Sequence, residues 1–136
     1  MDELIRGLPG NERLLHLTAR LALRNAPVER RLVVLVDQLE EAFTLCRDEA
    51  QRRALFDNLL YAASVAGGQT VILLAMRADF YPKAAAYPAL AAALSDHQVL
   101  VGPMSEDELR RAIERPAQLA GCELEAGLAE RLIADV

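Results

Sequence analysis

Two charged residues, Asp37 and Arg77, each follow directly on a short apolar run of the sequence. The runs cover residues 32–36 and 70–76, and such runs are typical of strands buried on both faces of a parallel sheet. Ligands bind at the carboxyl ends of these strands, and strands of consecutive crossover units are usually neighbours. Both side chains are therefore expected to face one crevice. An aspartate there can hold Mg²⁺, and the donor fork of an arginine can bind a terminal phosphate.

A structural role is the alternative for both residues. Asp37 and Glu40 also have the spacing of a helix start, in which Asp37 would cap the following turn. Arg77 would form a local ion pair with Asp79, which would in turn cap the next helix. From spacing alone, this structural interpretation is the favoured one.

The other nucleophilic and metal-ligating residues do not form a recognisable site. Cys46 and Cys122 lie far apart, with no Cys or His nearby at metal-ligand spacing, and are expected to be packing residues of a reduced protein. His16 and His97 have no nucleophile beside them in the sequence. No serine has the Gly-x-Ser-x-Gly setting of a nucleophile elbow, so an acyl-transfer enzyme has no support.

Composition restricts the class of protein. The chain has 136 residues, 53% of them hydrophobic and 4% aromatic, which favours one helix-rich globular protein. The net charge of -5 argues against nucleic acid as the main partner. The amino terminus lacks the basic start and long apolar core of a targeting signal, and no apolar run reaches the length of a membrane span. We expect a soluble, cytoplasmic protein without a nucleic-acid or membrane partner.

The predicted elements alternate as strand, helix, strand, helix, strand. The third and weakest strand covers residues 98–101. This order predicts an α/β fold over residues 1–102, with a small parallel sheet and right-handed crossovers, followed by a helical C-terminal portion over residues 103–136. Asp48 and Ser105 each begin a capping-box-like pattern, and Pro116 is expected to interrupt the helix that follows Ser105.

Three blocks of sequence carry a family resemblance. They are Leu-Val-Val-Leu-Val-Asp-Gln-Leu-Glu-Glu-Ala-Phe-Thr-Leu-Cys from position 32, Leu-Ala-Met-Arg-Ala-Asp-Phe-Tyr-Pro from position 74, and Val-Gly-Pro-Met-Ser-Glu-Asp-Glu-Leu-Arg-Arg-Ala-Ile-Glu-Arg-Pro-Ala from position 101. In this order and spacing the blocks resemble the bacterial STAND-class P-loop ATPases. The most similar group is the novel STAND domains, which are fused to β-propeller repeats or other signalling modules.

The resemblance implies a partial P-loop-type three-layer fold, with residues 1–102 as ATPase core and 103–136 as the start of a helical lid. It makes Asp37 the Walker B aspartate that binds Mg²⁺ and Arg77 the sensor arginine that contacts the γ-phosphate of ATP. The implied chemistry is in-line attack of water on ATP, catalysed by positioning and charge stabilisation. The implied role is a slow signalling switch that hydrolysis resets.

The chain departs from the family pattern beside the Walker B aspartate. Many related ATPases have a water-polarising glutamate at the position of Gln38. An amide can orient water but cannot take its proton. Glu40 is the carboxylate that would substitute, so the resemblance makes Gln38 and Glu40 the candidate catalytic residues.

The Walker A signature G-x-x-x-x-G-K-[ST] does not occur in the 136 residues, where Lys83 is the only lysine. We therefore expect a fragment of an ATPase domain that binds neither ATP nor Mg²⁺ by itself. A non-catalytic interaction or oligomerisation module is the alternative function. Without the Walker A strand, the strand at 70–76 has an open edge, which we expect to pair with residues 98–101 or with a second copy of the chain.

Overall fold

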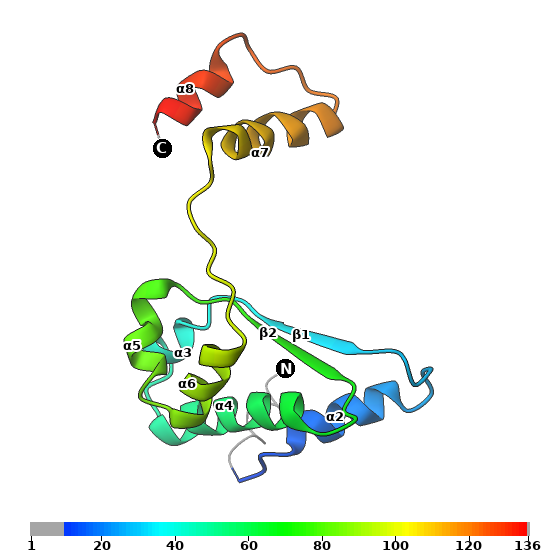
Figure 1. The fold of residues 1–136 in the computed structure, drawn as a ribbon. Helices are drawn as coiled ribbons and strands as arrows, with labels where there is room; N and C mark the ends of the chain where they lie inside the picture. Colours follow the sequence, from blue (N-terminus) through cyan, green and yellow to red (C-terminus); the bar gives the residue numbers. More distant parts are fainter. Residues whose placement is uncertain (1–9, 136) are drawn as a thin grey trace. The chain divides into compact units, whose positions relative to one another are not determined.

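Two strands, β1 (Leu32–Val36) and β2 (Thr70–Leu74), pair in parallel and in register, with Leu32 opposite Thr70 and Val36 opposite Leu74 (Figure 1). The computed structural model describes residues 10–135, which divide into two compact units between Gln98 and Val99. Both strands belong to the first unit. The expected mixed α/β fold with a small parallel sheet is confirmed.

Six helical segments complete the described part of the first unit, and three of them are long enough to cover other elements. Helix α4 (Glu49–Ser64) contacts β2, α2 (Leu14–Leu23) and α6 (Pro88–Asp96). It begins where the Asp48 carboxylate accepts the N–H groups of Ala50 and Gln51 at 2.9 and 3.4 Å, so Asp48 is the helix cap that its sequence predicts. The segments are α2 (Leu14–Leu23), α3 (Glu41–Thr44), α4 (Glu49–Ser64), η1 (Ala78–Phe80), α5 (Tyr81–Ala84) and α6 (Pro88–Asp96).

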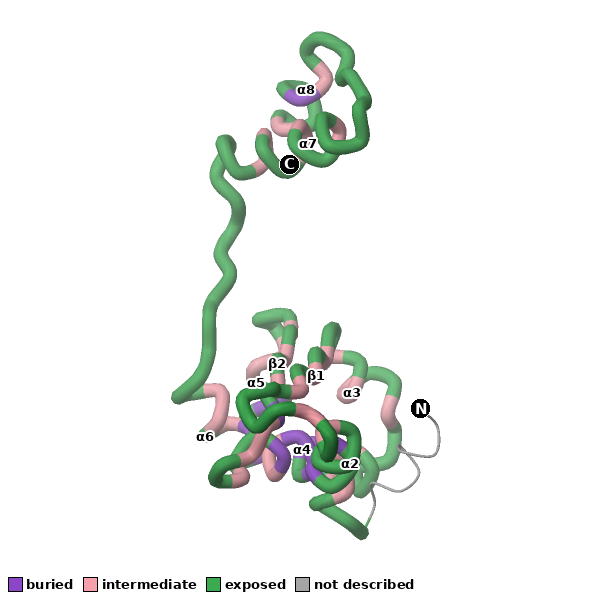
Figure 2. The backbone as a smooth tube through the Cα atoms, turned by 90° about the vertical axis from the view of Figure 1, so that its right-hand side faces the viewer, coloured by how far each residue is buried: buried purple, intermediate pink, exposed green. Residues whose placement is uncertain are grey.

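The core of this unit lies on the helix-covered face of the sheet. Phe56 of α4, Leu39 after β1 and Leu90 of α6 are almost completely buried, and Ala84 and Tyr87 join them. Figure 2 shows the buried stretches of this unit in purple, concentrated around α4 and α6. Each fully buried leucine or phenylalanine side chain contributes about 2 kcal/mol through the loss of water-exposed apolar surface. This cluster joins the helices to the segment that leaves β1.

No described residue covers the other face of the sheet, which contradicts the prediction that both strands are buried on both faces. Exposed residues alternate with half-buried ones along β1 and with buried or half-buried ones along β2, and Val33, Leu35 and Leu73 are 56%, 64% and 51% exposed. The apolar runs predict two covering layers. Among the described residues, helices cover one face only.

The predicted third strand is also wrong. Residues 98–101 form no strand, and Val99, Leu100 and Val101 are exposed. Within residues 10–135 the sheet has two strands, so β2 does not pair with residues 98–101 as expected. An apolar, β-branched segment becomes a strand only where a neighbour can satisfy its backbone hydrogen bonds, and here no such neighbour is described.

The second unit contains α7 (Glu106–Leu119) and α8 (Leu128–Ala134). Ser105 and Glu108 form the predicted capping box at the start of α7. The predicted interruption at Pro116 is wrong, because α7 continues through it to Leu119. Pro116 lies in the last turn, where a proline removes one helical hydrogen bond close to an end that frays in any case. Arg110 of α7 binds Glu130 of α8 at 2.6 Å and so joins the two helices.

None of the helices described for residues 10–135 combines the length and apolar character that crossing a lipid bilayer requires.

Candidate functional site

Asp37 and Arg77 leave the sheet at the same end. The parallel register continues just past the strands, because Ala75 donates its N–H to the Val36 carbonyl at 2.9 Å and Leu39 donates its N–H to the Ala75 carbonyl at 2.9 Å. The segment after β1 is therefore hydrogen bonded to the segment after β2. These bonds bring the two predicted site segments together, as the crossover argument anticipated.

A sharp turn at Gln38 shapes the segment after β1. Gln38 has φ +53° and is the one non-glycine residue of the described chain with a positive φ. Leu39, its neighbour, is 1% exposed and lies in the core. The left-handed conformation costs a non-glycine residue roughly 1–2 kcal/mol. Burial of Leu39 and its hydrogen bond to Ala75 offset this cost, while Asp37 and Gln38 stay exposed at the carboxyl end of β1.

The Asp37 carboxylate is exposed and has one oxygen engaged locally. Its Oδ1 accepts the N–H of Gln38 at 2.9 Å. The residue before α3 is Glu40, without a side-chain cap, so the alternative role of Asp37 as a helix cap is not seen. Three acidic, His or Cys side chains do not gather around a common point anywhere in residues 10–135. One exposed carboxylate fits Mg²⁺, which takes one or two carboxylates and completes its shell with water and phosphate oxygens.

Arg77 forms the predicted local ion pair with Asp79. Its Nε and Nη2 atoms donate to Asp79 Oδ1 and Oδ2, both at 3.0 Å, which is a two-point contact. The hydrogen bond and the charge attraction lower the pKa of the Asp79 carboxyl and raise that of the Arg77 guanidinium. The structural alternative also predicts that Asp79 caps the next helix. This part is wrong, because η1 and α5 begin without a side-chain cap. We call these two residues the Arg77 pair.

Glu40 connects the two segments. Its Oε2 accepts the backbone N–H of Arg77 at 3.4 Å, a long and therefore weak hydrogen bond. Of the four predicted site residues, Glu40 and Arg77 are thus in direct contact and Asp37 is bonded to Gln38. The structure places all four at one end of the sheet.

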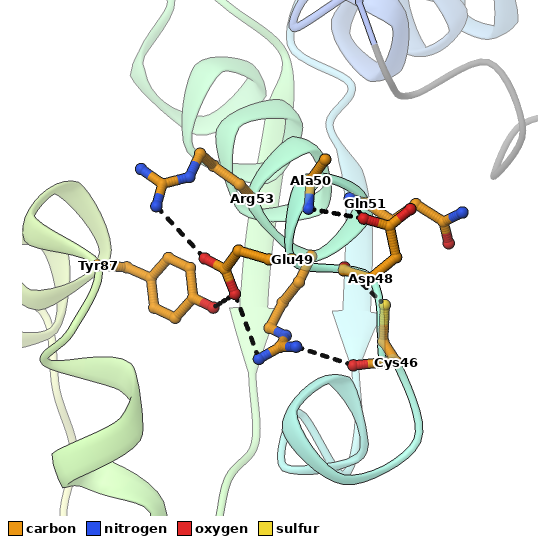
Figure 3. Close-up of polar contacts among 8 residues, drawn as sticks. Cys46, Asp48, Glu49, Ala50, Gln51, Arg53 and Tyr87 are labelled. Atoms are coloured by element: carbon orange, nitrogen blue, oxygen red, sulfur yellow. Dashed lines mark hydrogen bonds and ion pairs between the residues drawn. The ribbon is translucent and has the colours of Figure 1, made fainter.

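A second polar cluster has no counterpart in the sequence analysis (Figure 3). Glu49 accepts the Tyr87 hydroxyl at 2.9 Å and pairs with Arg52 and Arg53 at 3.4 and 3.3 Å. Arg52 also donates to the Cys46 carbonyl at 2.9 Å. Burial, together with the hydrogen bond to Glu49, raises the pKa of Tyr87. We call these four side chains, Glu49, Arg52, Arg53 and Tyr87, the Glu49 cluster.

The Glu49 cluster is structural in character. It ties the start of α4 to the residue before α6, and the Tyr87 ring packs edge-on against Phe56 at 4.7 Å between centroids. The spacing of Glu49 and Arg53 was the one available sequence signal, since a pair four residues apart shares a helix face. Nothing in the sequence connects either residue to Tyr87.

No curated protein and no solved structure matches the chain. The family model for novel STAND NTPase 1 matches residues 6–136, which is nearly the whole sequence. The chain belongs to the novel STAND NTPase 1 family.

Proposed function

We propose that this chain supplies the magnesium-binding and phosphate-sensing part of an ATP-hydrolysing STAND domain in a cytoplasmic signalling protein. One observation carries the proposal. The segments that bear Asp37 and Arg77 are hydrogen bonded to each other at the same end of the parallel strand pair, through Leu39 with Ala75 and through Glu40 with Arg77. Ligands of parallel sheets bind at this end.

Asp37 and Arg77 divide the work of binding a nucleoside triphosphate. The exposed Asp37 carboxylate would hold Mg²⁺, which neutralises phosphate charge when it is bound. Arg77 would contact the terminal phosphate through guanidinium hydrogens that Asp79 does not use. Within these 136 residues no Walker A sequence adds phosphate contacts. We therefore expect weak or no nucleotide binding by this chain alone.

Gln38 and Glu40 are the proposed water-positioning residues. Gln38 is exposed beside Asp37, and its amide can orient a water molecule without accepting the proton. Glu40 can accept a proton, although its carboxylate also holds the Arg77 backbone. Gln38 can orient water but not accept its proton, and the Glu40 carboxylate is shared with the Arg77 backbone. Both features are consistent with the slow hydrolysis that a signalling switch requires.

The test is a titration of Mg-ATP into this chain and into an extended protein, in which a Walker A strand, loop and helix precede the 136 residues. We expect binding by the extended protein, weakened by Asp37→Ala and by Arg77→Ala. Glu41→Ala is the matched control, because Glu41 is an exposed acid of the same segment that makes no side-chain hydrogen bond among the described residues. Tight binding by the 136-residue chain, or equal binding by all variants, would refute the proposal.

Self-association is a second candidate function, favoured by the face and edges of the β1–β2 sheet that no described residue covers or pairs with. Within residues 10–135, each copy presents an unpaired strand edge and, at positions 99–101, an exposed apolar segment with strand-like composition. In a dimer, residues 99–101 of each copy would pair with the open strand edge of the other copy and add a strand to its sheet. Analytical ultracentrifugation tests this: we expect a concentration-dependent dimer that Leu100→Lys disrupts. A monomer at all concentrations would contradict it.

A further inference from the structure

The Arg77 pair uses one edge of the guanidinium and leaves another free. Arginine carries five N–H donors in a planar fork. Asp79 accepts from Nε and from Nη2, which form one edge of that plane. Neither hydrogen of Nη1 has a partner among the described residues, so the edge between Nη1 and Nη2 is available. This free edge has the two-point geometry that binds phosphate oxygens.

The backbone around the pair is fixed by neighbouring contacts. Glu40 accepts the Arg77 N–H, and Phe80 donates its N–H to the Arg77 carbonyl at 3.1 Å. The Phe80 ring stacks on Phe43 at 6.3 Å between centroids. Asp79 lies within this anchored turn, so its carboxylate has a defined position relative to the Arg77 backbone. The two side chains remain 69% and 58% exposed, which leaves them open to a ligand.

We propose that Asp79 is a positioning residue, which holds the Nε–Nη2 edge of Arg77 and thereby presents the Nη1–Nη2 edge to the terminal phosphate of a nucleoside triphosphate. This inference rests on the proposed function of Arg77. It adds that Asp79 contributes to a preference for triphosphate over diphosphate, because the terminal phosphate is the group that the presented edge is proposed to bind.

The energetic reason is the freedom of an arginine side chain. An unpaired exposed Arg77 samples many rotamers, and binding must then immobilise it, which costs up to about tenfold in affinity for a long side chain. The pair with Asp79 removes part of this cost before the ligand arrives. The pair with Asp79 uses one hydrogen of Nη2, and the presented edge uses the other, so the two contacts do not compete.

The experiment compares Mg²⁺-dependent binding of ADP and of a non-hydrolysable ATP analogue by the extended protein. We expect Asp79→Asn, which keeps the shape and removes the charge, to weaken the triphosphate about tenfold and to leave ADP unchanged. Asp79→Glu should restore part of the loss. In an Arg77→Ala background, Asp79→Asn should have no further effect, because the group that it positions is gone.

The outcomes separate the two proposals. If Arg77→Ala lowers the preference for triphosphate but Asp79→Asn leaves it unchanged, Asp79 does not position the arginine and the inference fails alone. If Asp79→Asn strengthens triphosphate binding, the pair sequesters Arg77 from phosphate, which also overturns the inference. If Arg77→Ala leaves the preference unchanged, or the wild type binds neither nucleotide, the proposed function fails and the inference with it. Equal thermal unfolding midpoints for the variants confirm that each one is folded.

Discussion

The Glu49 cluster and the Arg77 pair use the same chemistry, a carboxylate bound to arginine, for different ends. In the Glu49 cluster, one carboxylate receives a buried tyrosine hydroxyl and two arginines, and so joins α4 to the residue before α6. The side chains of the Arg77 pair are bonded to each other alone among the described residues and lie in the open. The first arrangement holds elements together, whereas the second leaves guanidinium N–H groups of Arg77 unpaired among the described residues, at the carboxyl end of the strands.

The largest effect should come from Leu39, the core residue of the segment that follows β1. Leu39→Ala removes a side chain that is 1% exposed, in the segment bonded to Ala75. We expect a loss of about 3 kcal/mol in the free energy of unfolding, measured by urea denaturation, because a cavity replaces the buried leucine. Leu45→Ala, at a leucine 71% exposed in the next segment, is the control and should change it by less than about 0.5 kcal/mol. Equal losses would show that the segment is not anchored by Leu39.

Gln38→Glu should raise the rate of ATP hydrolysis at the end of the sheet that carries the Arg77 pair. A carboxylate at this position can take a proton from the attacking water, which an amide cannot. General-base catalysis contributes typically 10²–10⁴-fold, so we expect ATP hydrolysis by the extended protein to rise by about 100-fold. Phosphate release at saturating ATP measures this. An unchanged rate would mean that residue 38 does not face the water.

Tyr87→Phe should break the Glu49 cluster with little effect on nucleotide binding. Loss of the hydrogen bond to Glu49 should lower the free energy of unfolding by about 1 kcal/mol. The pKa of Tyr87 is raised in the folded protein, so its contribution is complete below the unfolded pKa of about 10 and is lost as pH rises through the folded value. Denaturation at pH 8 and pH 11 should therefore show wild type and variant converging at high pH. A constant difference would contradict this assignment.

The smallest effect on stability should come from the Arg77 pair itself. Exposed ion pairs contribute little because solvent screens them, so Asp79→Asn should leave the thermal unfolding midpoint nearly unchanged near neutral pH. The lowered pKa of Asp79 makes its contribution present above the unfolded carboxyl pKa and lost as pH falls through the folded value. The small difference from wild type should therefore disappear in acid. A large difference at pH 7 would mean that the pair is structural.

Local chemistry explains what could be predicted from the sequence. The caps at Asp48 and Ser105 depend on residues three positions apart. The apolar runs form strands because β1 and β2 satisfy each other's backbone hydrogen bonds. Asp37 and Arg77 lie at one end of the strand pair because each follows its strand within a few residues. Each of these features is decided within one element or one crossover.

The errors involve information that lies outside the segment concerned. Residues 98–101 have strand-like composition but no described neighbour, and the apolar outer residues of β1 and β2 have no described covering layer. The bond between Glu49 and Tyr87 joins residues that share no periodicity. The left-handed turn at Gln38 follows from the burial of Leu39, which the sequence does not reveal.

The central claim is that the Asp37 and Arg77 segments form one Mg-nucleotide site, and ATP binding by the extended protein with and without Mg²⁺ tests it directly. We expect Asp37→Ala to weaken binding only when Mg²⁺ is present, and Arg77→Ala to weaken it in both conditions. Glu41→Ala should match the wild type throughout. Wild-type affinity in Asp37→Ala with Mg²⁺, or in Arg77→Ala without it, would contradict the claim.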